Sequence, residues 1–149
     1  MNRRILLAAA ILALGLPAAA LAQTPVPTIV TPDKVAWTPG TGPYAGVDLA
    51  VLVGDPTKAG PYTVRVRIPD GGKLPPHTHA DTERVTVISG TLLVGLGDTM
   101  NAATMTALPA GSFASIPAGL PHYAMAKGET IVQIGGNGPM TMTAVGAAK

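Results

Sequence analysis

Three histidines and one glutamate are the side chains of this sequence best placed to do chemistry. His77 and His79 are separated by a single residue, so on an extended chain both imidazoles leave the same face. Glu83 has the same parity and begins a β-rich run, which lets its carboxylate converge on that face. His122 follows a later turn rich in glycine and proline. Neutral imidazoles with one carboxylate suit a mid-row divalent metal and leave positions open for substrate, O2 or water, so we predict a metal site with these four ligands.

The elements that must position these ligands are short β-strands between turn signals. Residues Tyr62–Ile68 alternate strictly between apolar and polar side chains, which is typical of a half-buried strand. Further strands are expected at Val47–Val53, Arg84–Ser89, Thr91–Leu96, Ala103–Leu108, Ser112–Ile116, His122–Ala126, Thr130–Ile134 and Met140–Val145. No stretch after residue 22 has a helical period with caps. The pattern predicts an all-β domain, an antiparallel sandwich or barrel.

Two stretches of the chain have a defined spacing. The first runs from Gly71 through five residues to His77, then His79, Glu83 and, after six more residues, a closing glycine at position 90. The second runs from Gly111 through Pro117 and Gly119 to His122. Together they resemble the two motifs of the cupin superfamily, except that Ala126 stands where the family usually has asparagine. That asparagine is not a metal ligand in the family, so the substitution affects a supporting hydrogen bond rather than the metal.

The resemblance implies a cupin-type jelly-roll β-barrel, also called a double-stranded β-helix, over residues 44–149. The competing interpretation is that the histidines are scattered over the surface. Against it, all three histidines and one of the two glutamates occupy ligand positions of the motifs. Affinity alone favours Cu2+ or Zn2+ for such a ligand set, so the metal depends on availability during folding. Resemblance to cupins implies iron or manganese most often, with zinc, copper and nickel also known.

The N-terminal residues predict export. Arg3 and Arg4 precede an apolar run, Ile5–Leu16, and a small-residue cleavage site ends at Ala22, so residues 1–22 are interpreted as a secretory signal peptide. The apolar run is short for the alternative, a membrane anchor, and we expect no stable membrane insertion. The two arginines also leave the twin-arginine route open beside ordinary secretion. The expected location is the periplasm or the outside of the cell.

Composition limits what the exported chain binds. Without Arg3 and Arg4 the eight remaining basic residues balance eight acidic ones, and no basic cluster suggests nucleic acid. Residues 23–43 contain five prolines and are expected to form an extended arm, with one edge strand at Thr28–Val30 and Trp37 anchoring the arm to the barrel. There is no cysteine, so the domain must be stable without disulfides.

Several residues outside the motifs allow two interpretations. Tyr123 could donate a proton to substrate, but its strand parity is opposite to that of His122 and favours outward packing. Arg65 and Arg67 could grip a carboxylate, yet a solvated face is the preferred interpretation; Arg84 is expected to be structural. The methionines have no metal-binding spacing and are interpreted as packing residues.

The expected pocket contains a metal with few charged partners, lined by Val, Leu, Ile, Ala and Met side chains. Such a pocket suits a small, weakly charged organic molecule or O2. We therefore expect a metal-dependent oxygenase or oxidoreductase, in which Glu83 could also act as a catalytic base. A non-catalytic metal-binding or sensory module is the alternative, and isomerase or hydrolase chemistry also fits the residues. Resemblance to cupins further implies a homodimer.

Overall fold

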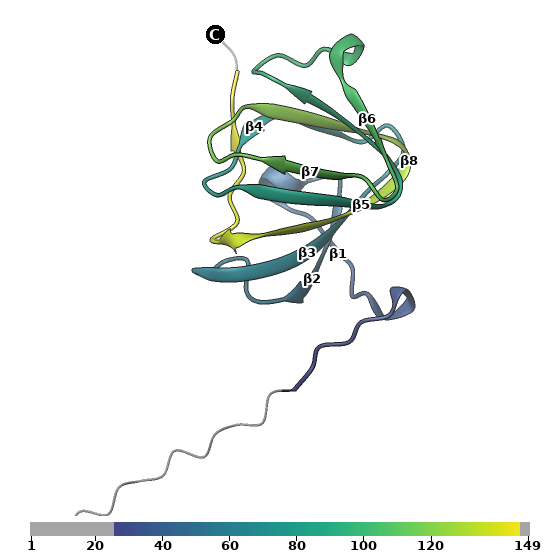
Figure 1. Ribbon diagram of the computed structural model, residues 1–149, viewed down its shortest axis with the longest axis vertical. Coiled ribbons are helices and arrows are strands. Elements are labelled where there is room, and N and C mark those ends of the chain that lie inside the picture. Colours follow the sequence, from purple (N-terminus) through teal and green to yellow (C-terminus); the bar gives the residue numbers. More distant parts are fainter. Residues whose placement is uncertain (1–25, 147–149) are drawn as a thin grey trace, which may run out of the picture.

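The computed structural model describes residues 26–146 (Figure 1). Within this range the chain forms nine strands and three short 3-10 helices, all of the helices three residues long. The strands are β1 Thr38–Pro39, β2 Asp48–Val53, β3 Gly60–Ile68, β4 Lys73–Thr78, β5 Glu83–Leu96, β6 Thr106–Pro109, β7 Phe113–Ile116, β8 His122–Gly138 and β9 Thr143–Ala144. The helices are η1 Pro32–Lys34, η2 Gly42–Tyr44 and η3 Ala102–Thr104. The fold is all-β, as predicted.

Two long, bent strands close the sheet on itself. Strand β8 pairs along its length with β3, β4 and β5, and β5 pairs in turn with β6, β7 and β8. All of these pairings are antiparallel. Figure 1 shows the resulting curled sheet, in which the bent strands β5 and β8 lie side by side and the sheet wraps around one interior. This is the jelly-roll barrel that the resemblance to cupins implied.

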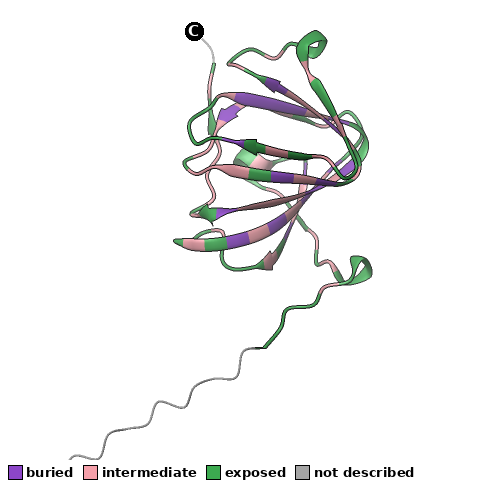
Figure 2. Cartoon of the chain, in the orientation of Figure 1, coloured by how far each residue is buried: buried purple, intermediate pink, exposed green. Residues whose placement is uncertain are grey.

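The core lies inside the barrel. Strand β3 buries Tyr62, Val64, Val66 and Ile68 and turns the residues between them outward, so the predicted alternation is confirmed. The inward residues of β5 and β8 complete a continuous apolar cluster, and Figure 2 shows the buried positions recurring along these strands. Burying apolar surface at about 25 cal/mol per Å² is the main stabilising contribution here, as the domain contains no disulfide.

The strand boundaries correct the sequence prediction in several places. Strand β4 was missed because Pro75 and Pro76 argue against a strand, yet β4 pairs with β8 through a register shift that accommodates both prolines. Residues Thr28–Val30 form no strand, because they lie on the arm where it extends away from the barrel (Figure 1) and have no partner strand. The strand expected at Met140–Val145 is reduced to Thr143–Ala144, the two residues that pair with β4.

Two predicted breaks in the chain are bends within strands. The predicted strands Arg84–Ser89 and Thr91–Leu96 both belong to the single strand β5. The two strands predicted on either side of Gly128, His122–Ala126 and Thr130–Ile134, both belong to β8. Gly90 allows the bend in β5, because its φ of 75° is left-handed and an added Cβ would lie 2.4 Å from the carbonyl oxygen of Glu129. Similarly, the strand expected from Ala103 begins later, at Thr106, after the turn η3.

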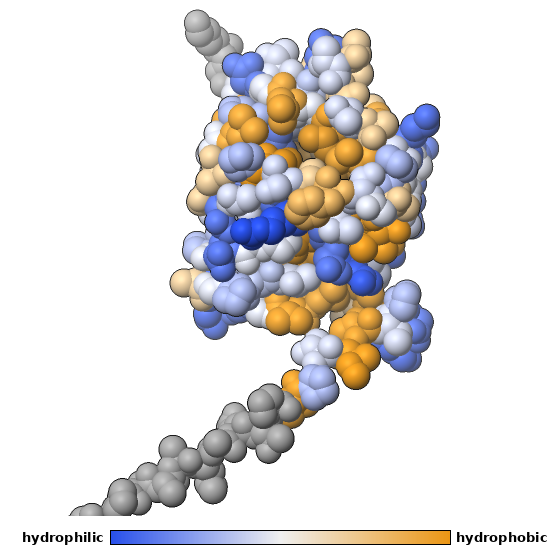
Figure 3. All heavy atoms as spheres, viewed as in Figure 1, coloured by the Kyte–Doolittle hydropathy of each residue, from blue (hydrophilic) through white to orange (hydrophobic). Residues whose placement is uncertain are grey.

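The described part of the arm is joined to the barrel by β1 and by Trp37. Strand β1 pairs with β2, and the guanidinium of Arg67 lies 4.7 Å from the centre of the Trp37 ring. Earlier in the arm, Val26 and Ile29 remain 86% and 82% exposed, and Figure 3 shows apolar side chains where the arm leaves the barrel. The expected signal peptide lies outside the described residues. Among residues 26–146 no helix is both long and apolar enough for a membrane span.

Candidate metal centre

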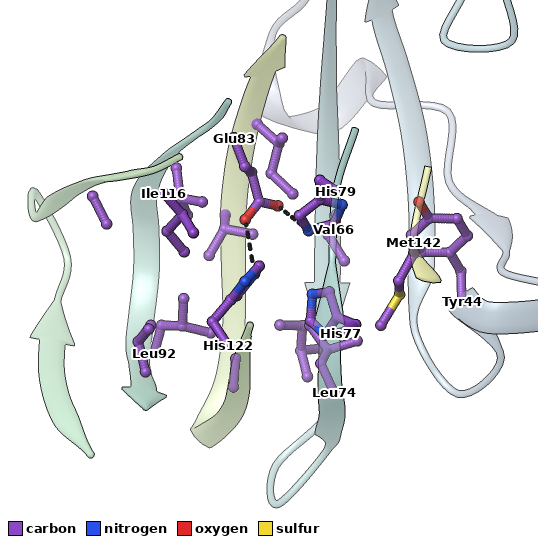
Figure 4. Close-up of a pocket in the computed structure, with 17 residues that line it drawn as sticks. Tyr44, Val66, Leu74, His77, His79, Glu83, Leu92, Ile116, His122 and Met142 are labelled. Atoms are coloured by element: carbon purple, nitrogen blue, oxygen red, sulfur yellow. Dashed lines mark ion pairs between the residues drawn. The ribbon is translucent and has the colours of Figure 1, made fainter. Parts of the chain in front are cut away.

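The four predicted ligands meet at one end of the barrel interior (Figure 4). His77 and His122 are direct partners in the pairing of β4 with β8, which sets their side chains next to each other. His79 follows β4 by one residue, and Glu83 is the first residue of β5. The two motif segments are also joined through the backbone, since the N–H of Gly119 donates to the carbonyl of His79 at 2.9 Å.

The imidazole rings are close to one another and to the carboxylate. Ring centres lie 4.8 Å apart for His77 and His79, 4.3 Å for His77 and His122, and 5.1 Å for His79 and His122. One ligand nitrogen from each ring lies within 4.8 Å of the others. The Glu83 carboxylate lies 3.6 Å from Nε2 of His79 and 3.5 Å from Nε2 of His122 (Figure 4).

Each imidazole is oriented by a hydrogen bond to the backbone. Nδ1 of His77 donates to the carbonyl of Pro75 at 2.6 Å, and Nδ1 of His122 donates to the carbonyl of Leu120 at 3.0 Å. Nδ1 of His79 donates to the carbonyl of Thr141. A carbonyl oxygen only accepts, so Nδ1 carries the proton and Nε2 of each neutral ring keeps a lone pair. Such backbone acceptors are a common way to fix the tautomer of a metal-binding histidine.

Burial and neighbouring charges act in opposite directions on the pKa values of Glu83 and His122. Burial lowers the pKa of His77 to about 4. Burial alone would raise the pKa of Glu83. In the metal-free protein a hydrogen bond from Nε2–H of His122 in its protonated form, together with the nearby histidine charges, outweighs burial and holds that pKa below its usual value. For His122 burial acts to lower the pKa, and the hydrogen bond to Glu83 with its negative charge raises it overall. The region thus favours one carboxylate and neutral His77.

The residues fit a bound divalent metal. Nε2 of His79 is buried and has no hydrogen-bond partner among the described residues, as expected for a lone pair directed at a ligand. The separations of 3.5 and 3.6 Å between Glu83 and the two Nε2 atoms are close to the roughly 3.4 Å between ligands of a tetrahedral site that are each about 2.1 Å from the ion. His77, His79 and His122 therefore form a group that could hold a metal ion, with Glu83 adjacent.

A small apolar pocket opens beside this group. Its cavity volume is about 50 Å³, and its walls are mostly Val, Leu, Ile and Ala side chains from the barrel interior. Two further lining residues were not assigned to the site from the sequence: Tyr44 from η2 and Met142 from the segment before β9 (Figure 4). Both come from outside the motifs, and no local sequence pattern indicates that they reach the pocket.

The remaining candidate residues lie away from the pocket. Tyr123 is 1% exposed and does not line the pocket; its hydroxyl bonds to the backbone of Asn101. Arg67 forms an ion pair with Asp48 at 2.7 Å, and Arg65 donates to the side chain of Gln133. Neither arginine lines the pocket.

The position of the unusual Ala126 is also explained. Its side chain is 2% exposed in the apolar core, and its backbone N–H donates to the carbonyl of Gly72 at 2.9 Å. Ala126 does not line the pocket. The loss of the family's asparagine thus leaves the four-residue group intact.

Comparisons with known proteins place this geometry in a fold family. Residues 33–142 match the family described as "Domain of unknown function (DUF4437)". No curated protein matches the sequence. Similar solved structures include the polyketide cyclase RemF from Streptomyces resistomycificus, with 17% identity and a TM-score of 0.64 over 83% of this chain and 89% of that one.

Two more similar structures are described as a dioxygenase and a cupin. A putative acetylacetone dioxygenase from Methylibium petroleiphilum has 20% identity and a TM-score of 0.63, covering 83% of this chain and 85% of that one. An RmlC-like cupin from Shewanella frigidimarina has 16% identity and a TM-score of 0.57, covering 75% and 91%. Identities this low show a shared fold, the cupin jelly roll, and fold alone does not determine the reaction.

Proposed function

The chain belongs to the DUF4437 family of cupin-like domains, and we propose that it is a metal-dependent enzyme acting on a small organic molecule. The observation that carries the proposal is the set of three histidines in an apolar pocket, each held at Nδ1 by a backbone carbonyl, with the Glu83 carboxylate near Nε2 of His79 and His122. We propose His77, His79, Glu83 and His122 as the metal ligands. Iron or manganese is favoured by the resemblance to cupins.

The bound ion would act as a Lewis acid and would permit oxygenase or oxidoreductase chemistry on the substrate. The chain's own residues do the rest. The imidazoles, fixed by the carbonyls of Pro75, Leu120 and Thr141, keep the ligand geometry before substrate arrives. The apolar walls exclude water and hold a weakly charged substrate.

Glu83 is the candidate catalytic base. Its side chain is 12% exposed, and it is the only carboxylate among the described residues that line the pocket. The pKa of Glu83 is held below its usual value, so the carboxylate is ionised throughout the neutral range, and it can accept a proton once it releases the ion. In this role one carboxylate oxygen accepts a proton from a carbon or hydroxyl of the bound substrate.

A non-catalytic metal-binding or ligand-binding module is the second candidate. The size of the cavity favours it, because about 50 Å³ leaves room for only a few water-sized groups. A protein that only holds a metal needs no more space than this. The two candidates share the metal site and differ in turnover.

Metal content and O2 consumption together test the proposal. The mature protein, purified without chelators and offered metals on folding, should hold about one ion per chain, and His122→Ala should lose it. The iron-loaded protein should then consume O2 with at least one small diol, thiol, phenol or 1,3-dicarbonyl compound. Absence of bound metal would refute the site. Stoichiometric metal without turnover on any substrate would favour the module.

We also propose export and self-association. The charged start and apolar run of residues 1–22 support a signal peptide. The exposed apolar side chains of Val26 and Ile29 on the arm support contact with a second copy. Cellular fractionation tests the first, with cytoplasmic retention of the full-length chain counting against it. Sedimentation tests the second, and a monomer at high concentration would refute it.

A further inference from the structure

The hydroxyl of Tyr44 is the one polar group of the pocket that the proposed metal site does not explain. Among the described lining residues, all side chains other than the four proposed ligands and Tyr44 are apolar. The Tyr44 oxygen is buried and has no hydrogen-bond partner in the described part of the protein. A buried hydroxyl of this kind normally has a partner, so Tyr44 offers a hydrogen bond to a water or to a ligand in the pocket.

The turn between β1 and β2 holds Tyr44 in a fixed position. The ring packs against the apolar core, and the turn between β1 and β2 is closed by a hydrogen bond from the N–H of Gly40 to the carbonyl of Val47 at 2.8 Å. A Cβ on Gly40 would lie 2.1 Å from the carbonyl oxygen of Tyr44, so the turn closes tightly around that residue. Figure 4 shows the Tyr44 ring beside Met142, on the side of the histidines away from Glu83. The hydroxyl is therefore preorganised rather than free to rotate out to solvent.

The charges of the pocket limit what can bind there. A divalent ion with one carboxylate and three neutral imidazoles has a net charge of +1, and no lysine or arginine is among the described lining residues. In apolar surroundings a single negative charge on the ligand neutralises this, whereas a dianion leaves an excess that burial disfavours. Burial first, and the charges of Tyr62 and Glu83 next, raise the pKa of Tyr44 to about 12, so its hydroxyl is a donor at neutral pH.

We propose that Tyr44 is a substrate-binding residue, whose hydroxyl donates a hydrogen bond to an oxygen of a small monoanionic ligand such as an enolate, phenolate or carboxylate. The remaining body of the ligand is apolar and lies against the aliphatic walls and Met142. This inference rests on the proposed metal-dependent function and specifies its substrate class. Tyr44 thus contributes a specificity determinant from the turn between β1 and β2, outside both sequence motifs.

Binding of formate to the zinc-loaded protein tests the inference without relying on activity. Formate is a small oxygen monoanion, and calorimetry gives its dissociation constant. The Tyr44→Phe variant should bind formate about 10-fold more weakly or worse, the usual effect of losing a hydrogen bond to a charged group. Tyr62→Phe is the matched control, because it removes a hydroxyl from a buried tyrosine that does not line the pocket, and it should bind formate as the unsubstituted protein does.

The outcomes separate this inference from the proposed function. Formamide, the neutral analogue, should bind the unsubstituted protein more weakly than formate, and equal affinity would overturn the preference for a monoanion. Retained zinc with unchanged formate affinity in Tyr44→Phe would overturn the role of Tyr44 and leave the metal site standing. If the unsubstituted protein holds no zinc, the proposed function and this inference fail together.

Discussion

The buried, neutral state of His77 predicts that the metal-free protein loses stability in mild acid. His77 is 4% exposed, and burial lowers its pKa to about 4 from an ordinary value of 6.5. Between these two values the unfolded chain binds a proton that the folded chain does not. The free energy of unfolding therefore falls as the pH is lowered from 6.5 towards 4 and increases as the pH is raised over the same range.

The size of this effect follows from the two pKa values. At pH 5 an unfolded histidine is almost fully protonated, whereas His77 in the folded chain is mostly neutral, and the difference lowers the free energy of unfolding by about 2 kcal/mol relative to pH 7. With a urea dependence of about 2 kcal/mol per molar, the unfolding midpoint shifts by roughly 1 M.

Urea titrations of the chelator-treated protein at pH 7 and pH 5 measure this shift, with His77→Gln as the comparison. The variant should be less stable at both pH values but should lose about 2 kcal/mol less between them. His122 has a raised pKa, so its stabilisation is present below 6.5 and is lost at higher pH, in the opposite direction to the effect of His77. The difference between the two proteins therefore reports His77 together with its coupling to His122. Equal pH dependence in the two proteins would refute the buried, neutral state of His77.

Three further substitutions probe the site and the strands that carry it. Glu83→Gln removes the charge and keeps the shape, so zinc affinity should fall by at least about 10-fold in competition with a chelating dye, and unchanged affinity would exclude Glu83 as a ligand. Gly90→Ala should lower the free energy of unfolding by about 2 kcal/mol or more, because it combines a left-handed φ with a backbone clash; Gly128→Ala has a similar φ but open space and should cost less. Tyr123→Phe removes two hydrogen bonds to the backbone of Asn101, so it should lower the free energy of unfolding by about 1–2 kcal/mol while leaving zinc content unchanged.

The sequence was sufficient for the local features of the fold. Alternation in Tyr62–Ile68 predicted the buried face of β3, because one side chain in two must enter the core. Parity between His77 and His79 predicted that both rings share a face, and the structure brings them together with His122 and Glu83. These features depend on residues close together in the chain or on a spacing that a turn can fix.

The features that were missed depend on contacts between distant segments. Proline at positions 75 and 76 argues against a strand, and only the pairing of β4 with β8 overrides it. Thr28–Val30 has the local composition of a strand but has no neighbour to pair with. Tyr44 and Met142 come from opposite sides of the motif region and meet only when the barrel closes, so no local pattern indicates that they share a pocket.

X-ray absorption at the zinc edge of the loaded protein tests the central claim most directly. Four side chains from three segments are expected to hold one ion, so the spectrum should require three imidazole nitrogens and one carboxylate oxygen at about 2.0–2.2 Å. His122→Ala should remove one imidazole contribution or abolish binding. A coordination sphere without imidazole, or a protein that retains no zinc after loosely bound ions are removed, would contradict the metal centre.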